Sequence, residues 1–265
     1  MLCQAKSLSG YKLECLDGEI GKVKEFYFDD RYWAIRYLVA ATGDWLVDKQ
    51  VLVSPYALIA VNEAEKHIAI DLTKKQIEDS PSLATDKPVS RQFEEAYYGY
   101  YEWPGYWSGP YMWGTYSYIE RDPVAWKNSI KAEKAWDHHL RSTHAVTGYH
   151  IQATDGEVGH VEDFLIDEET WAIRYLVVAT KHWWPGKKIL LSPQWIKQIS
   201  WSDSKVFADL SREAIQKAPE YTPDSLVTRD YETGLHRHYG RLGYWVEDAV
   251  PLSASAPMAA SIGRK

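Results

Sequence analysis

The chain has 265 residues, a length that suits about two domains of ordinary size, each able to bury its own core. Its formal net charge of −7 argues against binding to nucleic-acid backbones, because that binding depends largely on Lys and Arg side chains that release counterions. The start of the chain lacks the charged and apolar segments of a signal peptide, and no stretch approaches the roughly 18 apolar residues of a membrane-spanning helix. We therefore expect a cytoplasmic protein without a transmembrane segment and without a nucleic-acid partner.

The first part of the chain has the pattern of short strands joined by tight turns. Residues 11–15 and 19–28 flank Asp17-Gly18, a dipeptide that tolerates the positive φ angles of a hairpin turn. In residues 33–41 both alternating faces are mostly apolar, which suits a strand buried in a small closed barrel. Further strands are predicted at residues 51–53, 56–61 and 67–72.

A short helix is predicted directly after these strands. Thr73 and Gln76 have the spacing of a capping box, and the helix should end near Pro81. About six short strands followed by one or two helical turns indicate a small antiparallel barrel, whose closure would also hide the edges of the sheet.

The chain as a whole is a tandem duplication. The residues 33–39, Trp-Ala-Ile-Arg-Tyr-Leu-Val, return unchanged as 171–177, 138 positions later, and the same shift pairs many other residues without a gap. An unbroken register implies that both copies keep the same strand and turn lengths, and therefore one fold twice. Residues 1–137 are the first copy and 138–265 the second. The predicted parts are a barrel (1–90), an aromatic arm with a connector (91–137), a second barrel (138–228), and a second arm with a flexible tail (229–265).

Four motifs in each copy resemble the PRC-barrel family. They are Gly-Tyr at 10–11, Asp-Gly-Glu-x-Gly-x-Val at 17–23, the strand at 33–39 and Ser-Pro at 54–55, and they recur at 148–149, 155–161, 171–177 and 192–193. That family includes the cytoplasmic domain of the photosynthetic reaction centre H subunit and the C-terminal domain of the ribosome maturation factor. The resemblance implies an all-β fold of two small antiparallel PRC-type barrels in tandem, each with a short C-terminal helix and an aromatic arm. It also implies a docking or assembly role, and through the H subunit a link to a photosynthetic or electron-transfer complex, with no catalytic residues to carry over.

An aromatic stretch follows each predicted barrel. Because it belongs to the duplicated unit, we expect it to pack on a barrel rather than to serve as a ligand loop acquired once. Aromatic rings bury roughly 150 to 250 Å² each, so they can hold down even a loop of irregular backbone. The residues predicted to pack in this way are Tyr101, Trp103, Tyr106, Trp107, Tyr239, Tyr244 and Trp245.

The residues after the first arm have no counterpart of similar character in the second copy. The candidate partner surface there consists of Tyr111, Trp113, Tyr116 and Tyr118. Exposed Trp and Tyr rings could alternatively bind a carbohydrate or rest on a membrane surface, whereas single-stranded nucleic acid would also need a basic groove. A connector helix is predicted over residues 122–137, with Asp122 as N-cap and Pro123 in its first turn.

Arg36 and Arg174 lie in the middle of equivalent strands, between apolar neighbours. A partly buried guanidinium needs a partner, so we expect a buried ion pair in each copy, with a shared anion-binding pair as the alternative. The candidate carboxylates are Asp29 or Glu25 for Arg36, and Asp167 or Asp163 for Arg174.

The sequence shows no catalytic or metal-binding pattern. Asp17 and Glu19 sit beside a hairpin turn, where acidic residues are expected for turn chemistry. The histidines, including His236 and His238, have no cysteine nearby, and Cys3 has no counterpart in the second copy. We predict a non-catalytic protein without cofactor or metal that docks another protein or associates with itself. A small-ligand or carbohydrate-binding protein that uses the Tyr/Trp-rich segment is the alternative.

Overall fold

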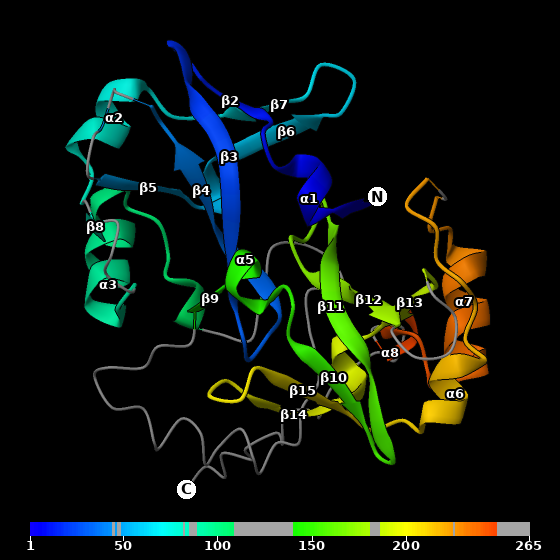
Figure 1. Cartoon of the computed structure of the whole chain (residues 1–265). Helices are drawn as coiled ribbons and strands as arrows, with labels where there is room; N and C mark the ends of the chain where they lie inside the picture. Colours follow the sequence, from blue (N-terminus) through cyan, green and yellow to red (C-terminus); the bar gives the residue numbers. More distant parts are fainter. Residues whose placement is uncertain are drawn as a thin grey trace, which may run out of the picture.

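The computed structural model describes residues 1–43, 46, 49–81, 83–84, 89–108, 140–180, 186–224 and 226–247, and it consists mostly of strands with a few short helices (Figure 1). No helix in this part of the chain has both the length and the apolar character of a membrane span. The first copy contains β1 (Leu2–Gln4), α1 (Ala5–Leu8), β2 (Lys12–Cys15), β3 (Gly18–Asp29), β4 (Ala34–Ala41), β5 (Lys49–Val53), η1 (Pro55–Ala57), β6 (Leu58–Asn62), β7 (His67–Ile70), α2 (Lys74–Asp79), β8 (Leu83–Ala84), α3 (Arg91–Tyr100) and η2 (Tyr106–Ser108). The second copy contains β9 (Leu140–Ser142), α5 (Thr143–Val146), β10 (His150–Ala153), β11 (Gly156–Asp167), β12 (Ile173–Thr180), β13 (Lys188–Leu191), η3 (Pro193–Trp195), β14 (Ile196–Ser200), β15 (Lys205–Ala208), α6 (Arg212–Gln216), α7 (Arg229–His238) and α8 (Tyr244–Glu247).

The shift of 138 residues is kept element by element. Strand β3 and its equivalent β11 both have twelve residues, and the arm helices α3 and α7 both have ten. The capping box predicted at Thr73 and Gln76 is present at the start of α2. The repeated sequence therefore forms closely matching elements in both halves, although β8 has no equivalent strand among the described residues of the second copy.

Each copy supplies most of one mixed sheet. The strands pair in the order β6-β7-β2-β3-β4-β5-β8 in the first copy and β13-β12-β11-β10-β15-β14 in the second. Most neighbours are antiparallel, but β2 pairs with β7 in parallel, as does β10 with β15, so the purely antiparallel sheet that we expected is wrong at this pair. A hairpin makes an antiparallel pair, whereas the long excursion from β2 to β7 returns the chain in the same direction. Among the described residues the pairing does not close into a ring.

Glycines allow two long strands of each sheet to approach closely. A Cβ on Gly21 would lie 2.2 Å from the backbone oxygen of Ala41, and one on Gly159 would lie 2.0 Å from that of Ala179. Gly21 also has a φ of +139°, which L side chains rarely adopt. The spacing of Asp-Gly-Glu-x-Gly, which both copies share, thus serves both the hairpin turn and the contact with the neighbouring strand.

The two copies exchange their first strands. Strand β1 pairs with β11 of the second copy, and β9 pairs in the equivalent register with β3 of the first copy. Figure 1 shows α1 beside the second copy and α5 beside β3. Ala34 and Ala172, which are equivalent residues, form a bridge with each other, so they lie on a pseudo-twofold axis.

The hydrophobic core continues from one copy into the other. The rings of Phe28 and Phe164 lie 5.8 Å apart between centroids, and Phe26 lies 6.4 Å from Trp171. All four side chains are buried. The interface between the copies is therefore part of the core rather than a wet contact between two finished domains.

Candidate interaction surface

Each aromatic arm begins with a helix that packs on its own sheet. In α3 the hydroxyl of Ser90 caps the N-terminus by accepting the amide of Phe93, and Glu94, Tyr97 and Tyr98 form a buried stripe. Tyr97 donates from its hydroxyl to the backbone oxygen of Leu52 in β5, over 2.9 Å. The arm backbone is thus helical where we allowed for an irregular loop. The sequence pattern did not reveal the helix, because a nearly continuous run of aromatic residues obscured the cap and the i, i+3, i+4 stripe.

A buried carboxylate joins each helix to its sheet. Glu94 has no exposed surface; it accepts the hydroxyl of Tyr37 from β4 over 3.2 Å and that of Tyr106 from η2, and it pairs with Arg91 at 3.1 Å. The second copy repeats this cluster around Glu232, which accepts hydroxyls from Tyr175 and Tyr244, both at 2.9 Å, and pairs with Arg229 at 3.0 Å.

The titration behaviour of this cluster fits a structural anchor. Burial raises the pKa values of Tyr37 and Tyr106 well above the ordinary tyrosine value, and the charge of Glu94 raises them further. The hydroxyls therefore remain protonated at neutral pH and act as donors to the carboxylate. Burial also raises the pKa of Glu232, against the opposing effect of Arg229.

Arg36 and Arg174 each meet an aspartate of their own copy. Arg36 lies 3.3 Å from Asp29, and Arg174 lies 3.0 Å from Asp167. Each guanidinium also covers an aromatic ring of the arm, at 3.9 Å from the centroid of Tyr106 for Arg36 and 4.1 Å from Tyr244 for Arg174. The two arginines therefore connect strand, turn and arm within each copy.

The arm residues singled out in the sequence lie at different depths. Tyr106, Tyr239 and Tyr244 are buried. Half-buried positions are held by Tyr101, Trp103, Trp107 and Trp245. The candidate partner residues Tyr111, Trp113, Tyr116 and Tyr118, the connector helix and the tail beyond residue 247 lie outside the described residues.

Other singled-out residues have local partners. Asp17 accepts the backbone amide of Lys74 at the start of α2 over 2.7 Å, so it fixes the position of that helix. His236 and His238 lie on a helix, where residues two apart do not share a face. His236 is buried against the hydroxyl of Tyr175, and the described residues contain no cluster of three or more potential metal ligands.

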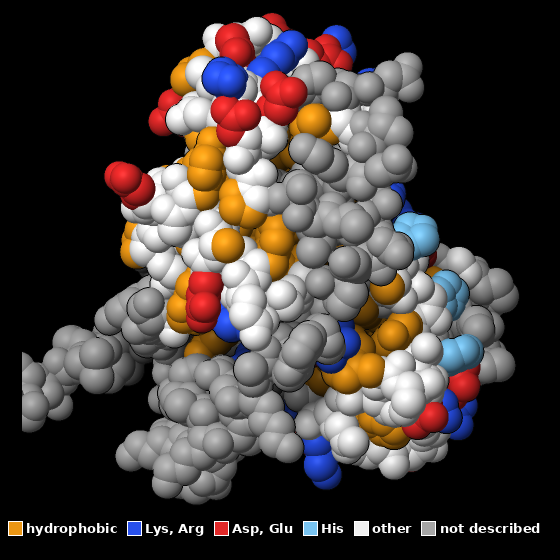
Figure 2. Space-filling model, turned by 90° about the vertical axis from the view of Figure 1, so that its left-hand side faces the viewer, with side chains coloured by type: hydrophobic (Ala, Val, Ile, Leu, Met, Phe, Trp, Pro, Cys, Tyr) orange, Lys and Arg blue, Asp and Glu red, His pale blue; other side chains and the backbone are white. Residues whose placement is uncertain are grey.

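An aromatic stack reaches the surface of the first copy. Trp103 stacks on Tyr101 at 4.5 Å and 14°, and Tyr56 stacks on Trp103 at 5.6 Å and 22°. Tyr100 meets Tyr101 edge-on at 4.8 Å, and Ile59 on the neighbouring strand β6 is 61% exposed. These five residues, Tyr56, Ile59, Tyr100, Tyr101 and Trp103, are called the copy-one aromatic surface. Figure 2 faces the side of the molecule that carries α2 and α3 and shows hydrophobic side chains gathered there, with acidic side chains nearby.

The second copy has polar residues at four of these five positions. The equivalents are Gln194, Lys197, His238, Tyr239 and Arg241. Because the second copy builds the same elements with polar side chains, this arrangement of elements does not require Tyr, Ile or Trp at these exposed and half-buried positions. The difference between the copies makes this surface the candidate site for an interaction.

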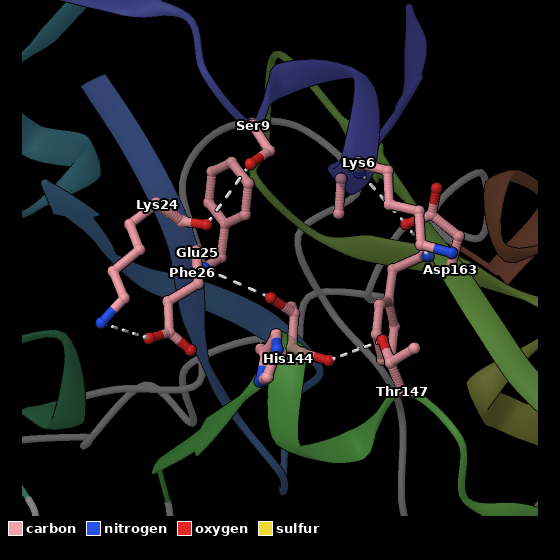
Figure 3. A pocket seen from close by; sticks show the side chains of 11 residues that line it. Lys6, Ser9, Lys24, Glu25, Phe26, His144, Thr147 and Asp163 are labelled. Carbon is pink, nitrogen blue, oxygen red and sulfur yellow. Dashed lines mark hydrogen bonds and ion pairs between the residues drawn. The ribbon is translucent and has the colours of Figure 1, made fainter. Parts of the chain in front are cut away.

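A separate pocket of about 300 Å³ lies where the copies meet (Figure 3). Equivalent residues of α1 and α5 and of β3 and β11 line it, among them Glu25 and Asp163. Asp163 accepts the backbone amides of Lys6 at 3.2 Å and Phe164 at 2.8 Å on one oxygen, while the other has no hydrogen-bond donor within the described parts of the chain. Burial raises the pKa of Asp163 to about 6.

Sequence reasoning missed the central role of Glu94 and Glu232. The available signal was their equivalence under the 138 shift, inside a segment otherwise rich in aromatic residues. It also missed Tyr56 and Ile59, which a position-by-position comparison of the two copies would have identified. No protein-family model matches the sequence, and no curated protein matches it either.

Proposed function

We propose that this protein is a non-catalytic interaction or assembly module made of two PRC-type barrels, and that a partner protein docks on the copy-one aromatic surface. The order β7-β2-β3-β4-β5, repeated as β15-β10-β11-β12-β13, supports the barrel assignment. The pairing that would close each barrel is part of the proposal. So are a cytoplasmic location and, through the resemblance to the H subunit, a partner in a membrane-bound electron-transfer assembly.

The observation that carries the docking role is the asymmetry between the copies. Ile59 is exposed on β6, at an end of the sheet, where the second copy has Lys197. A lysine on an edge strand protects it from pairing with other chains, so its replacement by isoleucine removes that protection. Tyr56 and Tyr100, each 41% exposed, add further apolar surface to the same copy.

The stacking geometry favours a protein partner over a carbohydrate. Sugars bind to free ring faces, but Trp103 has Tyr101 and Tyr56 stacked on it, so the described part of this surface presents mainly ring edges. The pocket between the copies is lined by none of these rings. A protein surface can cover such edges by ordinary apolar packing.

The proposed surface can be tested by exchanging the residues of the two copies. The full chain and a variant with Tyr56→Gln, Ile59→Lys and Trp103→Arg are used as baits in native extract, with quantitative mass spectrometry of the captured proteins. A protein captured by the natural chain and lost from this variant is expected. The matched control carries Gln194→Ala and Lys197→Ala in the second copy and should retain the protein.

If the variant retains every captured protein, the copy-one aromatic surface is not the docking site. Light scattering on the same proteins tests self-association, because a dimer that dissociates in the variant would identify a second copy of the chain as the partner.

A further inference from the structure

The second copy has an arginine that binds an aspartate, whereas the first copy has the same aspartate but a tryptophan at the position of the arginine. Arg241 follows the end of α7 and bonds Asp209 twice, at 3.0 Å to the carboxylate and 3.2 Å to the backbone oxygen. The equivalents in the first copy are Trp103 and Asp71. Asp71 is exposed and has no ion pair among the residues that the structure describes.

The backbone around Asp71 matches that around Asp209. The amide of Asp71 donates to the backbone oxygen of Ala57 over 2.8 Å, and the amide of Asp209 donates to Trp195, the equivalent of Ala57, over the same distance. Asp71 therefore lies against η1, the turn that also carries Tyr56, on which Trp103 stacks. The first copy keeps the carboxylate in place and has Trp103 at the position from which Arg241 supplies the guanidinium.

Two other exposed positions lose a basic group in the first copy. Where the second copy has Lys197 and His238, the first copy has Ile59 and Tyr100. Asp79 replaces Lys217, but this change is offset by Lys75, which replaces Glu213, and the two residues of each copy form an ion pair. The first copy thus has fewer basic groups at its aromatic surface than the second copy has at the equivalent positions, which favours a cationic partner.

The end of α3 adds an acidic residue in a strained conformation. Both arm helices end in a Schellman motif: in the first copy Glu102 donates to the oxygen of Gly99 and Trp103 to that of Tyr98. The left-handed position is held by Gly240 in the second copy, at a φ of +63°, but by Glu102 in the first, at +57°. A residue with a Cβ is less stable there than glycine, so an exposed carboxylate is retained beside Trp103 against a local penalty.

We propose that the copy-one aromatic surface binds an arginine-bearing segment of the partner protein, with one guanidinium on Asp71 in the manner of Arg241 on Asp209. This inference rests on the proposed function and specifies the chemistry of the partner. The methylene stem of the arginine lies along the ring edges of Trp103 and Tyr56, while Glu102 supplies further negative charge. The choice of arginine follows the example of Arg241, whose Nη2 donates to both the carboxylate and the backbone oxygen of Asp209.

The test uses an acetylated and amidated peptide in which arginine alternates with alanine, and the same peptide with citrulline in place of arginine. Citrulline keeps the shape of the side chain and removes its charge. Titration calorimetry on the full chain at low ionic strength should show binding of the arginine peptide, with the citrulline peptide weaker by about tenfold or more.

Three variants and one matched control locate the binding. Asp71→Asn and Trp103→Arg should each weaken the arginine peptide by about fivefold or more, the second because it supplies the guanidinium from the chain itself. Asp209→Asn, the same change in the second copy, should leave the affinity unaltered. Glu102→Gly should weaken the peptide while raising the unfolding temperature, which separates lost binding from lost folding.

No binding of the arginine peptide, equal binding of the citrulline peptide, or an affinity unchanged by Asp71→Asn would each overturn the proposal. General attraction to an acidic protein would appear as equal losses from Asp71→Asn and Asp209→Asn, which also overturns it. If these results accompany a captured protein that still depends on the copy-one aromatic surface, only the arginine chemistry fails and the docking role remains.

Discussion

Glu94→Ala should destabilise the protein by about 3 to 5 kcal/mol, because it removes a fully buried carboxylate and leaves its donors behind. The hydroxyls of Tyr37 and Tyr106 lose their acceptor in a buried site, and unsatisfied buried polar groups cost roughly 1 to 3 kcal/mol each. The cost of the unsatisfied hydroxyls is already part of the range of about 3 to 5 kcal/mol for breaking the buried ion pair with Arg91, so the two costs are not summed. The Arg91 side chain is 20% exposed and can partly hydrate, which favours the lower half of the range.

The free energy of unfolding is measured by urea titration of the full chain, followed by tryptophan fluorescence and circular dichroism. The matched control is Glu95→Ala, at the exposed neighbouring position of the same helix, which should change stability by less than about 0.5 kcal/mol. A loss below about 1 kcal/mol for Glu94→Ala, or equal losses for both variants, would refute the view that this carboxylate anchors the arm.

Three further changes test the packing and the electrostatics. Gly21→Ala should lower the free energy of unfolding, measured in urea, by about 3 kcal/mol or more, since its Cβ would overlap a backbone oxygen. Gly99→Ala in α3, where the space around the Cβ is open, should instead raise it by about 0.5 to 1 kcal/mol. Similar free-energy changes for the two variants would count against the close strand contact at Gly21. Ala34→Leu on the pseudo-twofold axis should cost about 1 to 3 kcal/mol by overpacking the contact between the copies, and a neutral result would contradict a tight interface there. Asp163 has a folded-state pKa of about 6, above its unfolded value, so its contribution to stability is lost as pH rises from about 4 to above 6. Asp163→Asn should remove this pH-dependent loss, which is on the order of 2 to 3 kcal/mol. Parallel curves of unfolding free energy against pH for the two proteins would disprove the raised pKa.

Much of the secondary structure followed from local sequence patterns. The Asp17-Gly18 turn, the capping box at Thr73 and the strand that carries Arg36 all depend on residues close in the chain, and the structure contains all three. The need of a buried guanidinium for a carboxylate was also evident, although several acids stood within reach in the sequence. Only the paired strands show that Asp29 faces Arg36, while Glu25 bonds Ser142 of the other copy.

The partner-binding surface was harder to anticipate. Sequence reasoning placed it at Tyr111, Trp113, Tyr116 and Tyr118, because exposure was judged from composition, and that prediction lies outside the described residues. Tyr56 and Trp103 are 47 positions apart in the chain and come together only because the arm returns across η1. A stack of this kind leaves no signal in the local pattern of either segment.

The sequence by itself determined that the molecule is one unit made twice, and it determined the turns, caps and strand lengths of that unit, because these depend on φ preferences and on side-chain periodicity over a few residues. Only the tertiary structure decided that β1 and β9 cross over to the opposite copy and that Glu94 gathers hydroxyls from β4 and η2. Such choices depend on which groups, distant in the sequence, can form hydrogen bonds with a buried strand edge or a buried charge. Because the two copies contain the same segments, the sequence does not show whether β1 pairs with its own copy or with the other one.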